Sequence, residues 1–321
     1  MTAATAPPRS ELTFAKARGS RKIKNNIATS LVSLAFAIAL IPLIWLLWTV
    51  VSKGYHVIFS SGWWTSDQAG IDQRVKGGGA LAAIIGTAEQ VALCTVISVP
   101  VGLLVGVFLV EYGRGLFARV TTFMVDILTG IPSIVAALFI YALFVTTLGG
   151  IGAGWLVSLA LVILMIPVIV RTTEEMLRLV PNELREASYA LGIPKWKTIV
   201  RVVIPTAFSG LITGIVLGVA RVAGETAPLL ILVGYSATTN MNLFSNPQST
   251  LPGFINQEFI NINTSSGPAA YHLDANGNRV AGAVVNYAPD RLWGAALTLI
   301  IIVMALNLIA RLIGRRNKVA S

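Results

Sequence analysis

Cysteine and histidine are nearly absent from this sequence of 321 residues, which contains one cysteine and two histidines. Cys94 stands alone in an apolar run, so the sequence offers no disulfide framework and no Cys or His spacing typical of a metal site. His56 and His272 fall in two segments that we expect to be external loops. Each is therefore interpreted as a solvated loop residue rather than a metal ligand or a catalyst.

A nucleotide-binding loop is also missing, because no G-x-x-x-x-G-K-[ST] motif occurs. The run of Gly77, Gly78 and Gly79 is accordingly interpreted as a turn or hinge. No Ser/His/Asp constellation and no cofactor fingerprint is found, which argues against a membrane-embedded enzyme. We expect no cofactor in this chain, and if ATP drives its activity, another chain must supply the ATPase and use the ATP and Mg.

Charged residues make up only 12% of the chain, whereas 55% of residues are hydrophobic and the mean hydropathy is +0.75. This composition lies outside the range of soluble globular proteins and is typical of polytopic membrane proteins. We expect an all-α protein with a basic tail at 1–26, a transmembrane domain at 27–313 and a second tail at 314–321. Apolar runs predict six spans, at residues 27–52, 80–110, from about 120 to the turn at 148–154, 155–170, 206–235 and 292–313.

The net charge of +10 invites a nucleic-acid-binding interpretation, but the distribution of the cations argues against it. Most cations fall in alternate loops, at Arg9, Lys16, Arg18, Arg21, Lys22, Lys24, Arg114, Arg119, Arg171, Arg178, Arg185, Lys195, Lys197, Arg201, Arg311, Arg315, Arg316 and Lys318. Few fall in the intervening loops, at Lys53, Arg74, Lys76, Arg279 and Arg291. This is the positive-inside pattern of a membrane protein, so both termini are expected in the cytoplasm.

A charged segment, residues 171–205, separates the fourth and fifth expected spans. Within it, Asn182 is a candidate N-cap of a helix that Gly192 would end, and Pro194 and Pro205 would bound a second helix. Both helices are amphipathic and too short to cross a bilayer, so they predict a protrusion at the membrane surface. An ordinary amphipathic connector is the alternative interpretation.

The charged segment resembles the cytoplasmic loop of bacterial ABC importer permeases, which has the form E-A-A, three residues, G, nine residues, I-x-L-P. Here Glu186, Ala187 and Ser188 precede Gly192, and Pro205 closes the pattern. Serine replaces the second alanine, valine replaces isoleucine and isoleucine replaces leucine, but the spacing is intact. In that family the loop is a coupling helix that docks in a cleft of the ATPase subunit, and the resemblance implies this role for the residues named here.

A second resemblance lies in residues 220–230, which read A-R-V-A-G-E-T-A-P-L-L. They are similar to the A-R-x-x-G-E-T-A-P-L-L signature of phosphate importer permeases of the PstA type, and the resemblance extends from about Gly79 to Arg311. It implies the type I ABC importer permease fold with six transmembrane helices, in a bacterial plasma membrane. The implied partners are a sister permease of the PstC type, two copies of the ATPase subunit and an external phosphate-binding protein.

The fifth expected span combines small residues with charges. Gly210, Gly214 and Gly218 recur every four residues, and on a continuous helix Arg221 and Glu225 would share their face. Small residues allow another helix to approach, and charges in a span face a bundle interior or an aqueous path. We therefore expect this face at a seam with a second permease.

From these positions we hypothesise that Arg221, Glu225 and Thr226 border the path of the transported anion. Arg221 would contact phosphate, and Glu225, one turn further on, would offset its charge and hold or gate the anion. A structural salt bridge without a transport role is the alternative. Because an arginine detects negative charge and not chemical identity, sulfate, molybdate or another oxyanion is the alternative substrate, and a regulatory role alongside transport stays open.

Several weaker features leave alternatives open. Glu89 either hydrogen-bonds inside the bundle or faces an outer vestibule, and Pro132 either bends a helix that lines a path or makes a simple packing kink. Gly102 and Gly106 form a weak helix-packing motif. Residues 236–289 are expected to form a long external loop with a hairpin turn at 276–277, and the calcium-like pattern at 274–278 lacks the residues that a calcium loop needs.

Overall fold

The computed structural model describes residues 19–264, 271–273, 279–281 and 286–316, in two compact units, Met1–Thr49 and Val50–Ser321. Helix α1 (Gly19–Ile58) begins in the first unit, where its apolar side chains are exposed. It starts before residue 27, so the last part of the expected N-terminal tail is helical, and residues 1–18 lie outside the described part.

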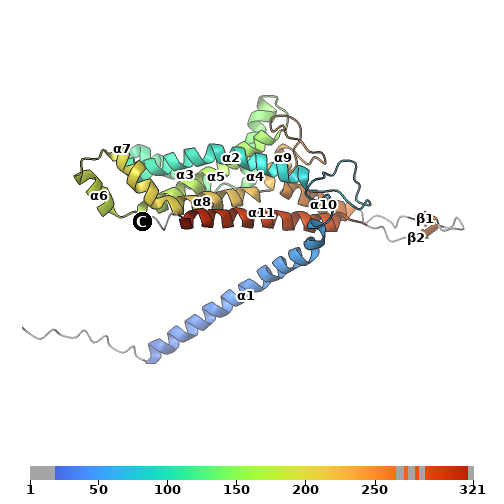
Figure 1. The fold of residues 1–321 in the computed structure, drawn as a ribbon, viewed down its shortest axis with the longest axis horizontal. Helices are drawn as coiled ribbons and strands as arrows, with labels where there is room; N and C mark the ends of the chain where they lie inside the picture. The colour runs from blue at the N-terminus through green and yellow to red at the C-terminus, as the bar shows by residue number, and fades with distance from the viewer. Residues whose placement is uncertain (1–18, 265–270, 274–278, 282–285, 317–321) are drawn as a thin grey trace, which may run out of the picture. The chain divides into compact units, whose positions relative to one another are not determined.

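Four long helices of the second unit run side by side, α2 (Leu81–Val107), α5 (Gly154–Arg178), α8 (Ile204–Ala223) and α11 (Ala288–Arg316) (Figure 1). Helix α5 packs against both α2 and α8, and α11 packs against α8. The most apolar 18-residue stretch of α5 is 67% buried, which is the largest share among the candidate membrane spans of the described residues. Helix α5 is therefore the central element of the bundle.

Two stripes of glycine explain the close packing around α5. Gly102 and Gly106 of α2 meet Ile169 and Thr173 of α5, and an added Cβ at either glycine would collide with those side chains. On the other side, the α8 glycines meet α5 side chains, in the pairs Gly210–Met176, Gly214–Thr172 and Gly218–Ile169. The expectation that the α8 stripe lies at a seam with a second permease is therefore wrong, because this face is already occupied by α5 of the same chain.

The third expected span is a sharply bent pair and not one kinked helix. Helix α3 (Gly115–Thr129) and helix α4 (Ser133–Ile140), continued by the π-helical segment η2 (Tyr141–Thr147), meet at an angle of 103°. Pro132 has φ −60° and ψ 139°, which is extended backbone at the start of α4. Proline disfavours a helical residue before it and lacks the N–H that would continue the helix, so the chain turns here instead of bending.

The described residues contain five helices long enough and apolar enough to cross a membrane, or six if the bent pair counts as one span. This confirms the expected all-α class with six spans. The fourth span is longer than expected, because α5 continues to Arg178, through the first residues of the segment assigned to 171–205. Its charged end is stabilised by contacts described below.

The expected external loop contains an additional helix, α10 (Leu251–Thr264), which packs against α11. Leu251 and Phe254 are fully buried there, so the loop interpretation is wrong for this part. Strands β1 (Tyr271–Leu273) and β2 (Arg279–Ala281) pair antiparallel, as a hairpin requires. The expected hairpin turn at 276–277 and the calcium-like pattern at 274–278 lie outside the described residues.

An apolar cluster lies beneath the loop that connects α1 to α2. Trp63 is 1% exposed, packs near Phe254, and its indole N–H donates to Thr298 Oγ1 of α11 at 2.9 Å. Trp63 is therefore a core residue, whereas its neighbour Trp64 is exposed. The indole N–H finds a partner inside the protein, which permits full burial of the ring.

Candidate functional site: the coupling segment and the outer end of α8

The charged segment folds as two short helices joined by a turn at one end of the bundle (Figure 1). Helix α6 (Asn182–Ala190) leads to Gly192, whose φ of +74° suits glycine, and helix α7 (Lys195–Thr198) follows. We call residues 180–203 the coupling segment. Glu186 and Ala187 are exposed on it, whereas Ser188 is buried and its hydroxyl lies 2.8 Å from that of Thr198.

Two details of the coupling segment differ from expectation. Asn182 is not the N-cap of α6: it lies in the first turn, and its side-chain oxygen accepts a hydrogen bond from Arg185. Pro205 does not end the second helix, because α7 continues through the π-helical segment η3 (Ile199–Val203) directly into α8. The wider π turn shifts the hydrogen-bond ladder, so Pro205 falls in the first turn of α8, where its missing N–H is tolerated.

A buried ion pair links the coupling segment to the C-terminal end of α2. The π-helical segment η1 (Phe108–Tyr112) extends α2, and Glu111 within it accepts two hydrogen bonds from Arg185 at 3.1 Å. The Arg185 side chain is 12% exposed and that of Glu111 is 6% exposed. Arg185 also donates to the carbonyls of Leu177 and Val180, so its guanidinium is well satisfied. Lys195 donates to the carbonyl of Glu111, which adds a second contact.

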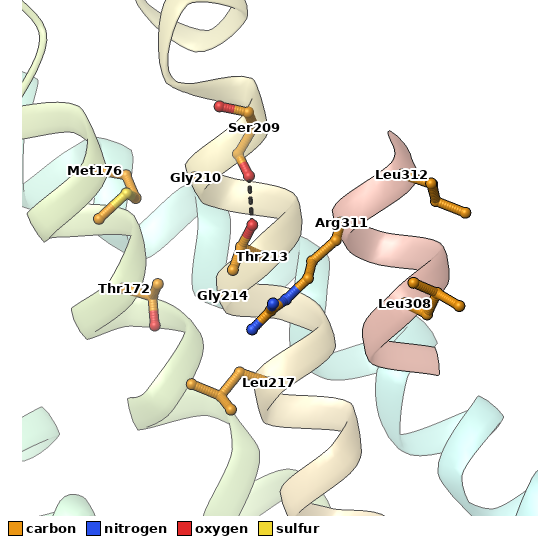
Figure 2. A pocket seen from close by; sticks show the side chains of 10 residues that line it. All are labelled: Thr172, Met176, Ser209, Gly210, Thr213, Gly214, Leu217, Leu308, Arg311 and Leu312. Carbon is orange, nitrogen blue, oxygen red and sulfur yellow. Dashed lines mark hydrogen bonds between the residues drawn. The ribbon is translucent and has the colours of Figure 1, made fainter. Parts of the chain in front are cut away.

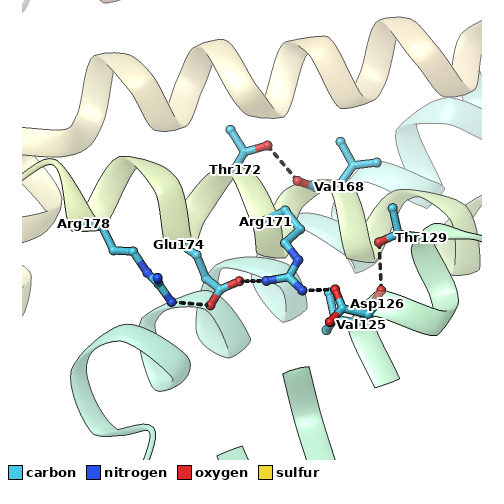
Figure 3. A network of polar contacts seen from close by, with 8 residues as sticks. All are labelled: Val125, Asp126, Thr129, Val168, Arg171, Thr172, Glu174 and Arg178. Carbon is cyan, nitrogen blue, oxygen red and sulfur yellow. Dashed lines mark hydrogen bonds and ion pairs between the residues drawn. The ribbon is translucent and has the colours of Figure 1, made fainter. Parts of the chain in front are cut away.

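A second polar network joins α5 to α3 next to the coupling segment (Figure 3). Arg171 donates to Asp126 of α3 and, at 2.7 Å, to Glu174, which also accepts from Arg178 at 3.3 Å. Glu174 is buried, whereas Asp126 and Arg178 are largely exposed. These contacts explain why α5 continues through its charged end instead of stopping at the apolar boundary.

The residues of the expected anion path lie at the other end of α8. Helix α8 ends at Ala223, Gly224 to Thr226 form a turn, and helix α9 (Ala227–Leu232) follows. Arg221 is exposed on the last turn of α8, and Glu225 and Thr226 are half-buried in the turn. Pro228 in the first turn of α9 explains the break, because a continuous helix would need the N–H that proline lacks.

The break separates the two charges that were expected to form a pair. Glu225 does not follow Arg221 on a continuous helix, so the predicted common face is wrong. No ion pair or hydrogen bond joins their side chains within the described residues, and neither side chain pairs with another charge there. Glu225 instead lines a small cavity of about 10 Å³ with Thr87 and Gln90 of α2. Arg221 is therefore exposed and has no counter-ion among the described residues.

A polar cluster between α2 and the segment before α10 was missed in the sequence. Gln90 donates to Gln248 at 3.0 Å, and Gln248 donates to Glu89 and to the carbonyl of Asn240. Both glutamines are fully buried, and Glu89 is half-buried, so Glu89 hydrogen-bonds within the bundle. Glu89 and Gln90 in an apolar run were the local signals, and their partner Gln248 is far away along the chain.

Two carboxylates near this end have shifted pKa values. Burial raises the pKa of Glu258 in α10, and Arg291 of α11, whose Nε lies 3.7 Å from it, partly opposes the shift. The backbone N–H of Ala69 lowers the pKa of Asp67 against a smaller effect of burial, and Thr239 adds hydrogen bonds in the same direction. Arg291 also donates to Gln68 at 2.8 Å, so its guanidinium forms a hydrogen bond within the protein in addition to facing Glu258.

The described residues contain no group of three or more His, Cys, Asp or Glu side chains that could hold a metal ion. The two sets of predicted site residues lie on the exposed surface of the coupling segment and at the Ala223 end of α8. They lie at opposite ends of the same continuous helical stretch, Lys195–Ala223. A force applied to one end can reach the other through this stretch.

Residues 98–318 match the family described as "Binding-protein-dependent transport system inner membrane component". The chain is 50% identical over 293 residues to "Phosphate transport system permease protein PstA 1" of Mycobacterium tuberculosis, covering 91% of this chain and 89% of that protein. It is 36% identical over 304 residues to "Phosphate transport system permease protein PstA" of Yersinia pestis, covering 94% of each.

Among solved structures, a chain of a bacterial alginate ABC transporter has a TM-score of 0.62 at 13% identity, covering 93% of this chain and 98% of that chain. A chain of the inward-facing MetNI methionine ABC transporter has a TM-score of 0.50 at 19% identity, covering 74% and 93%. At these identities the likeness shows the fold alone.

Proposed function

The chain belongs to the binding-protein-dependent transport system inner membrane components and, among them, to the PstA phosphate transport permeases, and we propose that it carries phosphate through an ATP-driven importer together with a sister permease of the PstC type. The chain is a permease subunit of an inner membrane and not itself an ATPase. ATPase subunits and a binding protein are its partners by family. We place two ATPase copies and an external phosphate-binding protein in the complex, with ATP and Mg used by the ATPase.

The coupling segment is the proposed contact with the ATPase subunit. Leu184, Leu191 and Trp196 are large apolar side chains that stay exposed on it, which suits burial against a partner. Glu186, Ala187, Ser188 and Gly192 would form the docking motif. The Arg185–Glu111 pair would carry movement of the docked helices into α2, and the continuous stretch through Pro205 would carry it into α8.

Arg221 is the proposed contact with the transported anion, and its exposed charge without an internal partner is the observation that carries this role. Phosphate at neutral pH carries one to two negative charges, and removing its water inside a membrane requires a fixed cation in exchange. The planar guanidinium can bind two phosphate oxygens at once. Since no carboxylate of the described chain neutralises Arg221, the anion would not have to displace one.

Glu225 and Thr226 would border the same path at the break between α8 and α9. A glutamate beside α2 and apart from the arginine would repel an anion that moved off Arg221 toward the protein interior. The turn at Gly224 would let this region move without unwinding either helix. Because Lys and Arg concentrate at the end of the bundle that carries α6 and α7, we place this end, and both termini, in the cytoplasm.

Uptake of radiolabelled phosphate tests this function. The chain is expressed with its partner subunits in cells that lack their own phosphate permease, and unlabelled phosphate, sulfate or molybdate is added as competitor. We expect uptake that depends on ATP and is inhibited by unlabelled phosphate alone. Equal inhibition by sulfate or molybdate would assign the permease to another oxyanion, and absence of uptake in a fully assembled complex would contradict the proposal.

A further inference from the structure

A groove between α5, α8 and α11 has no role in the proposed transport path. Its volume is about 580 Å³, and it is lined from three helices, by Thr172 of α5, Ser209 and Thr213 of α8, and Arg311 of α11 among others (Figure 2). Its α8 lining residues run from Ser209 to Leu217, across the middle of that helix, whereas Arg221 lies on the last turn. The groove hydroxyls of Ser209 and Thr213 are thus separated from Arg221 along α8 by roughly 12 to 18 Å, at 1.5 Å per residue.

Arg311 supplies a cation without a counter-ion to this groove. Figure 2 shows its guanidinium reaching from α11 across to α8, beside Thr213 and Gly214. None of the described residues that line the groove is acidic, and within the described part of the chain Arg311 forms no ion pair. Helical side chains point toward the helix N-terminus, so this arginine is directed along the bundle and away from the charged C-terminal end of α11.

The hydroxyl groups beside Arg311 differ in the hydrogen bonds that they can still form. Thr213 already donates to the carbonyl of Ser209 at 2.8 Å, and Thr172 donates to that of Val168 at 2.7 Å. Both threonine oxygens therefore remain available as acceptors, whereas no internal hydrogen bond is formed by the Ser209 hydroxyl among the described residues. The groove thus presents one cation and one hydroxyl donor for an anion, and two acceptors for a neighbouring hydroxyl group.

The remaining walls of the groove are apolar. Met176 lines it from α5, and Leu217, Leu308 and Leu312 line it with more than half of each leucine exposed. Such walls suit hydrocarbon chains and give a small hydrated anion nothing to bind. The combination of a cation, hydroxyl groups and open apolar walls is that of a site for an amphiphilic anion.

We propose that this groove binds an anionic phospholipid of the cytoplasmic leaflet whose headgroup carries free hydroxyls, such as phosphatidylglycerol. Arg311 and the Ser209 hydroxyl contact the phosphodiester, the threonine oxygens accept from the headgroup hydroxyls, and the acyl chains lie along the leucines. The proposal rests on the topology proposed above, which puts this end of the bundle in the cytoplasmic leaflet, where anionic lipids and basic interhelical pockets meet. The lipid fills the gap between α8 and α11 that side chains leave open.

Lipid titration of the purified complex tests this site. The complex containing the full chain is stripped of lipid in a neutral detergent, and phosphatidylglycerol, phosphatidylcholine or inorganic phosphate is added. Bound lipid is counted by native mass spectrometry and the unfolding midpoint is recorded. We expect phosphatidylglycerol alone to bind and to raise the midpoint, and Arg311→Gln to weaken its apparent affinity roughly fivefold, as one interfacial cation contributes about 1 kcal/mol.

Two further variants serve as controls. Arg119→Gln removes another exposed cation, from α3 and outside the groove, and is expected to bind phosphatidylglycerol as the parent complex does. Arg311→Lys keeps the charge and is expected to retain most of the affinity. Unchanged lipid binding in Arg311→Gln, equal binding of phosphatidylcholine, or binding of inorganic phosphate in place of the lipid would each overturn the proposal. Phosphate uptake measured in parallel separates this site from the transport path.

Discussion

Two sets of arginines in the bundle differ in their surroundings. Arg171, Arg185 and Arg291 each face a carboxylate; Arg185 is largely buried and Arg291 is almost fully buried. Arg221 and Arg311 are exposed and pair with no carboxylate among the described residues. The first group joins helices, because a buried cation is tolerated only with its partner in place. The second group keeps its charge available, which is the requirement for binding an anion from outside the chain.

Removal of a paired arginine should have the largest effect on stability. Arg185→Met leaves the Glu111 carboxylate buried without its partner, which costs about 3–5 kcal/mol. We expect a much lower unfolding midpoint of the complex and loss of substrate-stimulated ATP hydrolysis. Arg201→Met removes an exposed cation of η3 that forms no ion pair among the described residues, and should shift stability by about 0.5 kcal/mol at most. Similar losses of stability in both variants would contradict the difference between paired and unpaired arginines.

The pair of Glu258 and Arg291 should make the stability of the folded chain depend on pH. Since burial raises the pKa of Glu258 in the folded state, the folded chain binds the proton more tightly than the unfolded chain. Stability should therefore fall as the pH rises from about 4.3, the ordinary pKa of a glutamate, through the raised pKa. Glu258→Gln should flatten this part of the stability profile, because Arg291 keeps its bonds to Gln68 and to the carbonyl of Asp72.

The measurement is the unfolding midpoint of the complex between pH 5 and pH 8, with Asp290→Asn, an exposed carboxylate of α11, as the matched control. A parent profile that rises with pH over this range, or an unchanged slope in Glu258→Gln, would show that this carboxylate does not set the dependence.

The exposed pair between α3 and α5 should give the smallest effect. Asp126→Asn removes one partner of Arg171, but Arg171 retains Glu174 and its side chain is 34% exposed. Exposed ion pairs contribute about 0.2–1 kcal/mol, so the unfolding midpoint should fall only slightly and phosphate uptake should persist. A loss as large as that of Arg185→Met would mean that exposure is a poor guide to the importance of a pair in this bundle.

The number of spans and the turn at Gly192 between two short helices were predictable from the sequence, because apolar run length and helix-ending glycines act locally. The break after Ala223 was also signalled, by Gly224 and Pro228, but the periodic glycines of α8 favoured one continuous span. The sequence could not reveal which helix those glycines meet. The partner is α5, whose Thr172 and Met176 pack against the glycines of α8. Tertiary packing alone decides which two helices meet in this way.

The buried pairs were beyond prediction for a related reason. Arg185 is 74 positions from Glu111, and Gln90 is 158 positions from Gln248, so no local spacing connects them. Helix α10 was missed because its segment is rich in polar residues, and its buried apolar side chains, Leu251 and Phe254 among them, are few. Local patterns thus predicted the elements, whereas the contacts that assign a role to each charge required the fold.

The most direct test of the account is phosphate uptake by complexes that carry Arg221→Gln or Arg221→Lys, each compared with Arg119→Gln. A charge-assisted hydrogen bond to the anion contributes about 1.5–3 kcal/mol, so we predict at least tenfold lower uptake in Arg221→Gln, partial uptake in Arg221→Lys and normal uptake in Arg119→Gln. All three complexes should assemble with unchanged stability, because Arg221 has no partner in the described chain to lose. Normal phosphate uptake by a fully assembled Arg221→Gln complex would contradict the account.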